Sequence, residues 1–326
     1  MNQLTDLASD SASRFGQAED GLFRPAPTLS ILKVGALINT ASGSCDADAE
    51  VDLAMICERA GLPIAKIWCA TGADLGPALE DAKAQALDLL IVLGGDGTIR
   101  SAAGLCTAQG PLLIPLPGGT MNMLPKALYG ERDWKSALTA TLAAPVLQSV
   151  SAGQVDGERF YVAGIFGAPS LWARAREAVR EGDLNAALSH GQVALEKTFS
   201  GQVRYSLPGQ AAQAQAVSVL CPLTSKALPA DAPALEVAAL NPDGALSALK
   251  LAVRGLVADW RDDPSVTVHR SAQVELASQE PIPAILDGES LTLSLTETVA
   301  FVAQAFTAVR PAPGSGSGAN PAVLAP

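Results

Sequence analysis

The chain has 326 residues, with 22 Lys and Arg against 33 Asp and Glu, so its formal net charge is −11. This acidic balance excludes general nucleic-acid binding, which requires many cations, and an aromatic content of 4% excludes a stacking platform for single strands. With 48% hydrophobic residues, the chain has enough apolar material for two ordinary domains. No run of about 18 apolar residues predicts a membrane span, and no secretory peptide is apparent. Five scattered cysteines fit a reducing compartment, so we expect a cytoplasmic protein.

Strand and helix patterns alternate between residues 29 and 145. The predicted strands lie at 31–38, 64–69, 89–93 and 112–116. The predicted helices lie at 46–60, 76–87 and 99–108. Strands that alternate with helices of this length predict an α/β domain, an open parallel sheet with helices on both faces.

The pattern changes after about residue 145, and the region 146–310 is expected to form a second, mainly antiparallel β domain. Its strand-like segments are 215–220, 235–240, 265–269, 273–277 and 291–295. Helical patterns at 169–198 and 246–260 interrupt them, and the apolar stretch 299–309 fits a buried strand or a short helix. The polar residues 1–28 and the Pro/Gly/Ser-rich residues 311–326 predict disordered tails.

The strongest local signal is an apolar strand that runs into Gly94-Gly95-Asp96-Gly97-Thr98. Three glycines around one Asp allow the backbone to approach a phosphate closely, where a Cβ would block it. Thr98 is a suitable cap for the next helix, whose first N–H groups attract anions. The alternative is a tight strand-to-helix turn capped by Asp96. No Gly-Lys-Ser/Thr follows, so this is not a Walker A loop.

A second glycine turn follows the next strand and contains Gly118, Gly119, Thr120 and Asn122. Neighbouring parallel strands would place the two turns side by side, so their backbone N–H groups would suit a triphosphate. Asn122 is expected either to bind a phosphate or a ribose, or to form an ordinary Asx turn.

Together the two turns resemble the catalytic domain of the diacylglycerol kinase and sphingosine kinase family. An upstream turn, Asn39-Thr40-Ala41-Ser42-Gly43, resembles the Asn-Pro-x-Ser-Gly turn of that family. Downstream, Asp287-Gly288-Glu289 is similar to its late Asp-Gly-Glu motif. The elements occur in the family's order, so the resemblance spans about residues 30–310.

The resemblance implies a Rossmann-like ATP-binding domain followed by a β-sandwich domain, with the active site in the cleft between them. It implies that Asp96 lies beside the ATP phosphates through Mg²⁺ and that Glu289 is the general base for the acceptor hydroxyl. The residues that it assigns to the nucleotide are Asn39, Ser42, Gly43, Thr71, Gly94, Gly95, Asp96, Gly97, Thr98, Gly118, Gly119, Thr120 and Asn122.

Three positions depart from the family's pattern. Arg100 replaces an Asn after the first turn and is expected either to meet phosphate or to be a solvated helix residue. Asn122 is followed by Met123 rather than by Asp. Residues 231–236 read Asp-Ala-Pro-Ala-Leu-Glu where soluble bacterial members carry acidic residues near a structural Mg²⁺, which puts that metal in doubt here. Asp287 is expected to matter for holding its turn.

These features predict an ATP- and Mg²⁺-dependent lipid kinase that phosphorylates the hydroxyl of a neutral lipid. Diacylglycerol is the first candidate, and a sphingoid base or ceramide is the next. The substrate would be taken from a membrane surface by transient peripheral attachment, and a homodimer is left open. The alternatives are a NAD kinase-like enzyme and a non-catalytic sensor of nucleotide or lipid on the same fold.

Overall fold

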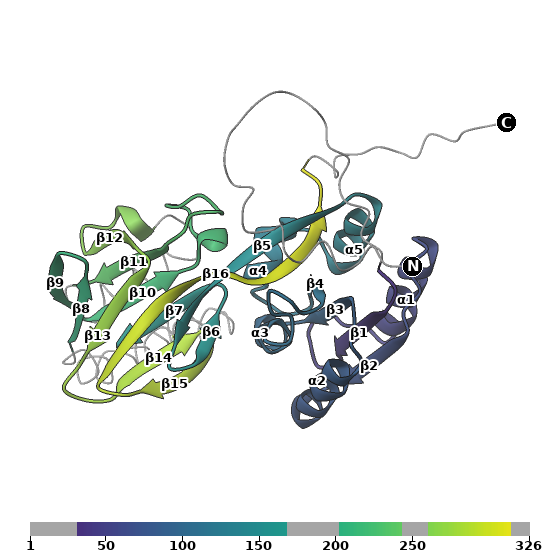
Figure 1. Ribbon diagram of the computed structural model, residues 1–326, viewed down its shortest axis with the longest axis horizontal. Helices are drawn as coiled ribbons and strands as arrows, with labels where there is room; N and C mark the ends of the chain where they lie inside the picture. Colours follow the sequence, from purple (N-terminus) through teal and green to yellow (C-terminus); the bar gives the residue numbers. More distant parts are fainter. Residues whose placement is uncertain (1–30, 168–201, 243–259, 314–326) are drawn as a thin grey trace, which may run out of the picture. The chain divides into compact units, whose positions relative to one another are not determined.

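The computed structural model describes residues 31–167, 202–242 and 260–313, which are coloured in Figure 1. The predicted helices at 169–198 and 246–260 fall outside these residues, apart from Trp260. The predicted N-terminal tail also falls outside them, as does most of the C-terminal tail. Within the described residues, no helix is long and apolar enough to cross a membrane.

Four parallel strands lie in the order β2, β1, β3, β4 (Figure 1). Their bounds are Lys66–Ala70 for β2, Val34–Asn39 for β1, Leu89–Gly94 for β3 and Leu112–Pro117 for β4. Every residue of β3 is buried, as expected for a parallel strand with both faces covered. Ile38 pairs with Leu93, and Gly94 with Pro117, so the carboxyl ends of β1, β3 and β4 meet at one edge.

Helices pack around these parallel strands. Their bounds are Ala49–Arg59 for α1, Leu75–Ala84 for α2, Asp96–Ala103 for α3, Met123–Tyr129 for α4 and Trp134–Ala143 for α5, with a short helix η1 at Gly72–Asp74. α1 contacts α5, α2 contacts α3, and α3 packs on β3. The predicted α/β domain is confirmed, whereas the sequence patterns had not predicted α4 and α5.

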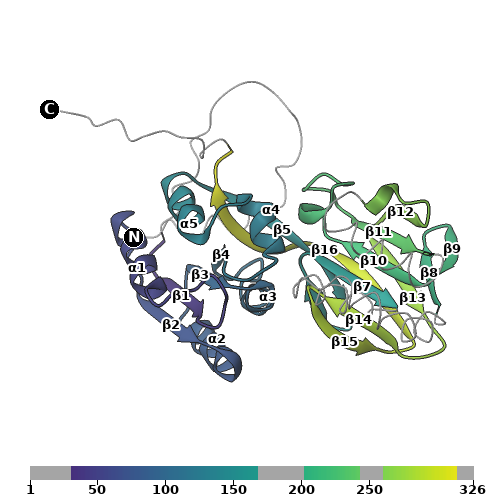
Figure 2. The same ribbon diagram turned by 180° about the vertical axis from the view of Figure 1, so that it is seen from behind.

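The remaining strands are mostly antiparallel and form two layers, seen from behind in Figure 2. One layer has the order β12, β11, β10, β7, β14, β15. The other continues the parallel sheet from β4 through β16, β13, β8 and β9, with β5 and β6 attached to it. The bounds are β5 Pro145–Val155, β6 Glu158–Phe160, β7 Ala163–Gly167, β8 Val203–Leu207, β9 Gln210–Ala214, β10 Ala216–Leu220, β11 Leu235–Leu240, β12 Val266–Ser271, β13 Gln273–Ala277, β14 Ile282–Leu286, β15 Glu289–Leu293 and β16 Thr296–Pro311; the short helices η2 and η3 span Pro222–Thr224 and Trp260–Asp262.

A shared apolar core joins these two layers. Phe160 of β6 and Phe166 of β7 are fully buried and meet edge to face, with ring centroids 6.4 Å apart. The same cluster includes Val237 from one layer and Leu276 and Val299 from the other. Sheets that bury facing apolar surfaces form a β-sandwich. The predicted antiparallel second domain is therefore confirmed.

Two long strands, β5 and β16, connect the sandwich to the parallel strands (Figure 1). β16 pairs with β13 near its beginning, and Ala308 near its end pairs in parallel with Leu113 of β4. β5 runs antiparallel to β16, with an irregularity between Val302 and Phe306. The stretch 299–309, left open between strand and helix, is thus a strand that returns the chain to the α/β sheet.

Two elements that carry candidate site residues begin earlier than the sequence predicts. α3 begins at Asp96 rather than at residue 99, because the extended Gly95 acts as its N-cap residue. β15 begins at Glu289 rather than at residue 291. Asp287 and Gly288 have φ values of +48° and +94°, which close the hairpin in two residues. Asp96 and Glu289 therefore both begin a regular element.

Candidate active site

The two glycine turns pack directly against each other at the carboxyl ends of β3 and β4. The N–H of Gly118 donates to the carbonyl oxygen of Gly94 at 2.9 Å. A Cβ on Gly118 would lie 2.8 Å from the backbone nitrogen of Gly94, and one on Gly119 would lie 2.7 Å from the Cα of Gly95. From the sequence, the absence of side chains at these positions is attributed to the close approach of a phosphate. The structure adds a second reason, which is contact between the turns.

The Thr98 side chain packs against Gly94, and a hydrogen bond from Asn39 to Thr98 links β1 to α3. A Cβ on Gly94 would lie 2.7 Å from the Cβ of Thr98, whose side chain is buried. The Oγ1 of Thr98 accepts a hydrogen bond from Nδ2 of Asn39 at 2.8 Å. The expectation that Thr98 caps α3 is wrong, because the helix already begins at Asp96 with Gly95 as its cap residue.

Asn122 braces the second glycine turn with both ends of its amide. Its Oδ1 accepts the N–H of Gly119 at 2.8 Å, and its Nδ2 donates to the carbonyl oxygen of Gly119 at 2.7 Å. Its φ of +50° is a left-handed conformation that Asn adopts more readily than most residues. The structure thus shows a local turn contact, while contact with a nucleotide stays a prediction. Thr120 of the same turn is exposed.

The turn after β1 lies along the same edge of the sheet. The N–H of Ser42 donates to the carbonyl oxygen of Asn39 at 3.0 Å. The N–H of Ser44, which follows Gly43, donates to the carbonyl oxygen of Gly118 at 2.9 Å. This turn therefore contacts the second glycine turn. Thr71 is exposed at the end of β2, the edge strand, where it is the N-cap residue of η1.

Asp96 begins α3 and links it to α4. Its Oδ1 accepts the N–H of Met123 at 2.9 Å. A carboxylate in the first turn also interacts favourably with the helix dipole. Among the described residues, no group of three or more His, Cys, Asp or Glu side chains could hold a metal ion. A single carboxylate such as that of Asp96 is one ligand of the type that Mg²⁺ uses, since this ion commonly binds one or two carboxylates and takes its other ligands from phosphates and water.

Glu289 lies against the first turn of α3. The position that a Cβ on Gly97 would take is 2.9 Å from Oε1 of Glu289. Because Gly97 has no side chain, the Glu289 carboxylate can occupy that space. The contact brings together two motifs that lie far apart in the sequence, the Gly94–Thr98 turn and the Asp-Gly-Glu turn at 287–289.

Asp287 anchors the Asp-Gly-Glu turn at 287–289 to the segment that leads into β7. Its carboxylate accepts three backbone N–H groups, from Tyr161 at 2.7 Å, Val162 at 2.9 Å and Ala163 at 3.0 Å. Its own N–H donates to the carbonyl oxygen of Ala163 at 2.9 Å. Burial raises the pKa of Asp287 to about 6, although the three N–H groups and the nearby Arg100 charge oppose this rise.

Arg100 connects α3 to β6. Its Nε donates to the carbonyl oxygen of Arg159 at 2.8 Å, and a terminal nitrogen donates to Oε2 of Glu158 at 2.7 Å. The Arg100 side chain is 17% exposed, so it is not a solvated helix residue, one of the two roles left open by the sequence.

Sequence reasoning missed the segment 158–163, which contacts both Arg100 and Asp287. Most of its contacts use backbone atoms, and backbone donors carry no sequence signal. The Asp-Gly pair at 287–288 signals a tight hairpin. It does not reveal which N–H groups the Asp side chain will bind.

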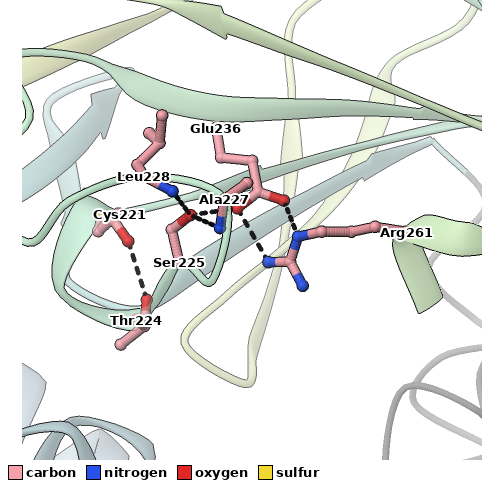
Figure 3. A network of polar contacts seen from close by, with 7 residues as sticks. All are labelled: Cys221, Thr224, Ser225, Ala227, Leu228, Glu236 and Arg261. Carbon is pink, nitrogen blue, oxygen red and sulfur yellow. Dashed lines mark hydrogen bonds and ion pairs between the residues drawn. The ribbon is translucent and has the colours of Figure 1, made fainter. Parts of the chain in front are cut away.

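A buried ion pair lies where the family resemblance would place a structural Mg²⁺. Glu236 of β11 is fully buried, and its two oxygens accept hydrogen bonds from Arg261 at 2.5 Å and 2.9 Å (Figure 3). Ser225 also donates to Glu236, while its Oγ accepts the N–H groups of Ala227 and Leu228. The guanidinium therefore neutralises Glu236, one of the two carboxylates in residues 231–236, and the Glu236–Arg261 ion pair does not fit a metal site.

Solved structures share this fold. A diacylglycerol kinase from Bacillus anthracis is 17% identical, with 88% of this chain and 100% of that chain covered and a TM-score of 0.64. A second protein from the same bacterium, whose kinase assignment is itself provisional, is 18% identical, with 91% and 100% covered and a TM-score of 0.65. At these identities the likeness concerns the fold alone.

The sequence itself also matches a known family. Residues 33–155, which run from the start of the parallel sheet to the end of β5, match the model of the diacylglycerol kinase catalytic domain. This region contains the Asn39 turn and both glycine turns. Over residues 33–155, the chain is therefore similar to the diacylglycerol kinase catalytic domain.

Proposed function

We propose that this protein is a lipid kinase that transfers the γ-phosphate of ATP to the hydroxyl of a neutral lipid. Diacylglycerol is the first candidate acceptor, and a sphingoid base or ceramide is the next. The family match supports a kinase. The observation that carries the proposal is the position of Oε1 of Glu289, 2.9 Å from where a Cβ on Gly97 would lie. It sets a carboxylate beside the turn that we assign to the phosphates.

The start of α3 and the two glycine turns supply the phosphate site in this proposal. Gly95, the cap residue of α3, has no side chain to bind the first N–H groups of the helix. Unsatisfied N–H groups at a helix N-terminus attract anions. Asp96 would hold Mg²⁺, which neutralises phosphate charge during transfer.

Glu289 acts as the general base. A lipid hydroxyl has a pKa far above 7, so it attacks a phosphorus atom readily only if a base removes its proton. The carboxylate of Glu289 accepts this proton as the oxygen forms its bond to the γ-phosphorus. The bond from that phosphorus to the bridging oxygen breaks, and ADP leaves with the electron pair.

The lipid would be presented from a membrane surface by apolar contact rather than by charge. A net charge of −11 does not favour attraction to anionic lipids. Met123, whose N–H binds Asp96, is 41% exposed and places an apolar side chain beside the site.

The test is transfer of label from γ-labelled ATP to a panel of acceptors: diacylglycerol, sphingosine and ceramide in mixed micelles, and NAD in solution. Asp96→Asn is the control, and we expect it to lower turnover about 100-fold or more, or about 3 kcal/mol in the barrier, with little change in melting temperature. Label in a lipid supports the proposal. Label in NAD favours the NAD kinase alternative, and ATP binding without transfer to any acceptor favours a sensor.

A further inference from the structure

We propose that Arg100 is a positioning residue that fixes Glu289 against the first turn of α3. It acts through β6 and Asp287 rather than by touching a substrate. This inference rests on the proposed function, because the role of Glu289 as the base belongs to it. The contacts themselves come from the structure alone.

The first link runs from α3 to β6. The Arg100 guanidinium uses two of its nitrogens on two different acceptors, the carbonyl oxygen of Arg159 and the carboxylate of Glu158. Arg100 is 17% exposed, whereas Glu158 is 59% exposed. An exposed partner makes the ion pair weak in itself. The two hydrogen bonds still fix the orientation of β6 relative to α3, because the planar Arg100 guanidinium binds two acceptors on β6 at once.

The second link runs from β6 to Asp287. β6 ends at Phe160, and the next three residues donate their N–H groups to the Asp287 carboxylate at 2.7–3.0 Å. The N–H of Asp287 in turn donates a hydrogen bond to the carbonyl oxygen of Ala163. Any shift of β6 therefore moves the donors that hold this turn.

The third link closes the path on α3. Asp287 and Gly288 form the tight hairpin turn, and Glu289 follows directly as the first residue of β15. Oε1 of Glu289 lies beside Gly97, which is three residues before Arg100 and so lies within one helical turn of it. The path thus begins and ends on the same turn of α3, which fixes the distance between Glu289 and that turn.

Two other roles for Arg100 predict different results. If its guanidinium bound ATP phosphate, its loss would weaken ATP binding first. If it only stabilised the fold, its loss would lower the melting temperature without a specific dependence on Glu289. The positioning role predicts a lower kcat at unchanged KM for ATP, and an effect that requires the Glu289 carboxylate.

The experiment compares Arg100→Met with Arg100→Lys, which keeps the charge but not the planar fork. Arg310→Met is the matched control, since Arg310 also donates to a side-chain oxygen and a backbone carbonyl, those of Gln148 and Pro311. We expect Arg100→Met to lower kcat about 10- to 100-fold, Arg100→Lys to lower it less, and Arg310→Met to leave it unchanged. In a Glu289→Gln background, Arg100→Met should have no further effect on kcat. An equal fold-loss in both backgrounds, or a raised KM for ATP at normal kcat, overturns the positioning role.

A second readout needs no activity. Hydrogen exchange at the amides of Tyr161, Val162 and Ala163 should be faster in Arg100→Met than in the parent, as in Asp287→Asn, and unchanged in Arg310→Met. Unchanged exchange in Arg100→Met overturns the proposal even if the variant is slow. If the parent phosphorylates no lipid, the proposed function fails, while this measurement still decides whether Arg100 holds the segment.

Discussion

The glycine turns and the Asp-Gly-Glu turn both face the start of α3, but they are held there by opposite means. The glycine turns contact each other through backbone atoms, and a Cβ on Gly118 would lie 2.8 Å from the nitrogen of Gly94. The Asp-Gly-Glu turn depends on one side chain, the Asp287 carboxylate, which accepts hydrogen bonds from three backbone N–H groups. One region therefore requires the absence of side chains, and the other requires a particular one.

This difference separates two kinds of sensitivity. Packing between backbones does not depend on charge, so the glycine turns should respond to added volume and not to pH. A carboxylate held by N–H groups in a partly buried place depends on its ionisation, so the Asp-Gly-Glu turn should respond to pH.

The largest effect is expected from Glu289→Gln, which removes the base and leaves the shape of both regions unchanged. Lipid phosphorylation at saturating ATP should fall about 10²- to 10⁴-fold, the usual loss for a general base, while ATP affinity stays the same. Asp287→Asn should lower kcat less and the melting temperature more, because it weakens the anchor of the turn. An active Glu289→Gln beside an inactive Asp287→Asn would reverse the two roles.

Gly118→Ala should damage the glycine turns most. Its Cβ meets the backbone of Gly94, which cannot move aside as a flexible side chain can. Overpacking of this kind costs about 3 kcal/mol in the free energy of unfolding, measured by urea denaturation. Gly43→Ala in the neighbouring turn is the control, because no atom lies within 4 Å of its added Cβ. Equal stability of the two variants would show that the turns are not in firm contact.

The contrast between the two regions also explains what the sequence could predict. The glycine turns follow apolar strands, and parallel neighbours necessarily bring their carboxyl ends to one edge. The alternation of strands and helices was therefore enough to place Gly94 beside Gly118. The prediction that Thr98 caps α3 was wrong because Gly95, which has no side chain to signal a cap, takes that position.

The surroundings of the Asp-Gly-Glu turn could not be predicted in the same way. The donors to Asp287 are backbone N–H groups more than one hundred residues earlier in the chain. Arg100 looks like any charged residue on a helix until β6 is placed beside it. The partners of side chains that bind distant backbone atoms become apparent only after the strands have been arranged in space.

The raised pKa of Asp287 should make the free energy of unfolding depend on pH. Burial raises its pKa to about 6 from 3.8, so between these values the folded state binds more protons than the unfolded state. Stability from this group is therefore full below about pH 4 and is lost as the pH rises through about 6. Relative to Asp287→Asn, the parent should lose about 2 kcal/mol between pH 4 and pH 7, less than the full shift implies because the group is partly exposed. Urea unfolding of both proteins at several pH values measures this, and parallel pH profiles would contradict it.

The smallest effect on folding is expected where the two regions meet, at Gly97. In Gly97→Ala the new methyl group lies 2.9 Å from Oε1 of Glu289, the mobile end of a long side chain, so the carboxylate moves and the backbone does not. The free energy of unfolding should change by less than about 1 kcal/mol, since Ala also favours the helix. The displaced base should lower kcat about tenfold, or about 1.4 kcal/mol in the barrier.

Gly76→Ala is the matched control for this last change, because Gly76 is likewise the second residue of its helix but has no atom within 4 Å of an added Cβ. It should gain a little stability and keep full activity. The comparison also separates the two explanations for Gly97. If Gly97→Ala lowers kcat at unchanged ATP affinity, the missing side chain makes room for Glu289. If it instead weakens ATP binding at normal kcat, the space belongs to a phosphate, and the contact with Glu289 is incidental to catalysis.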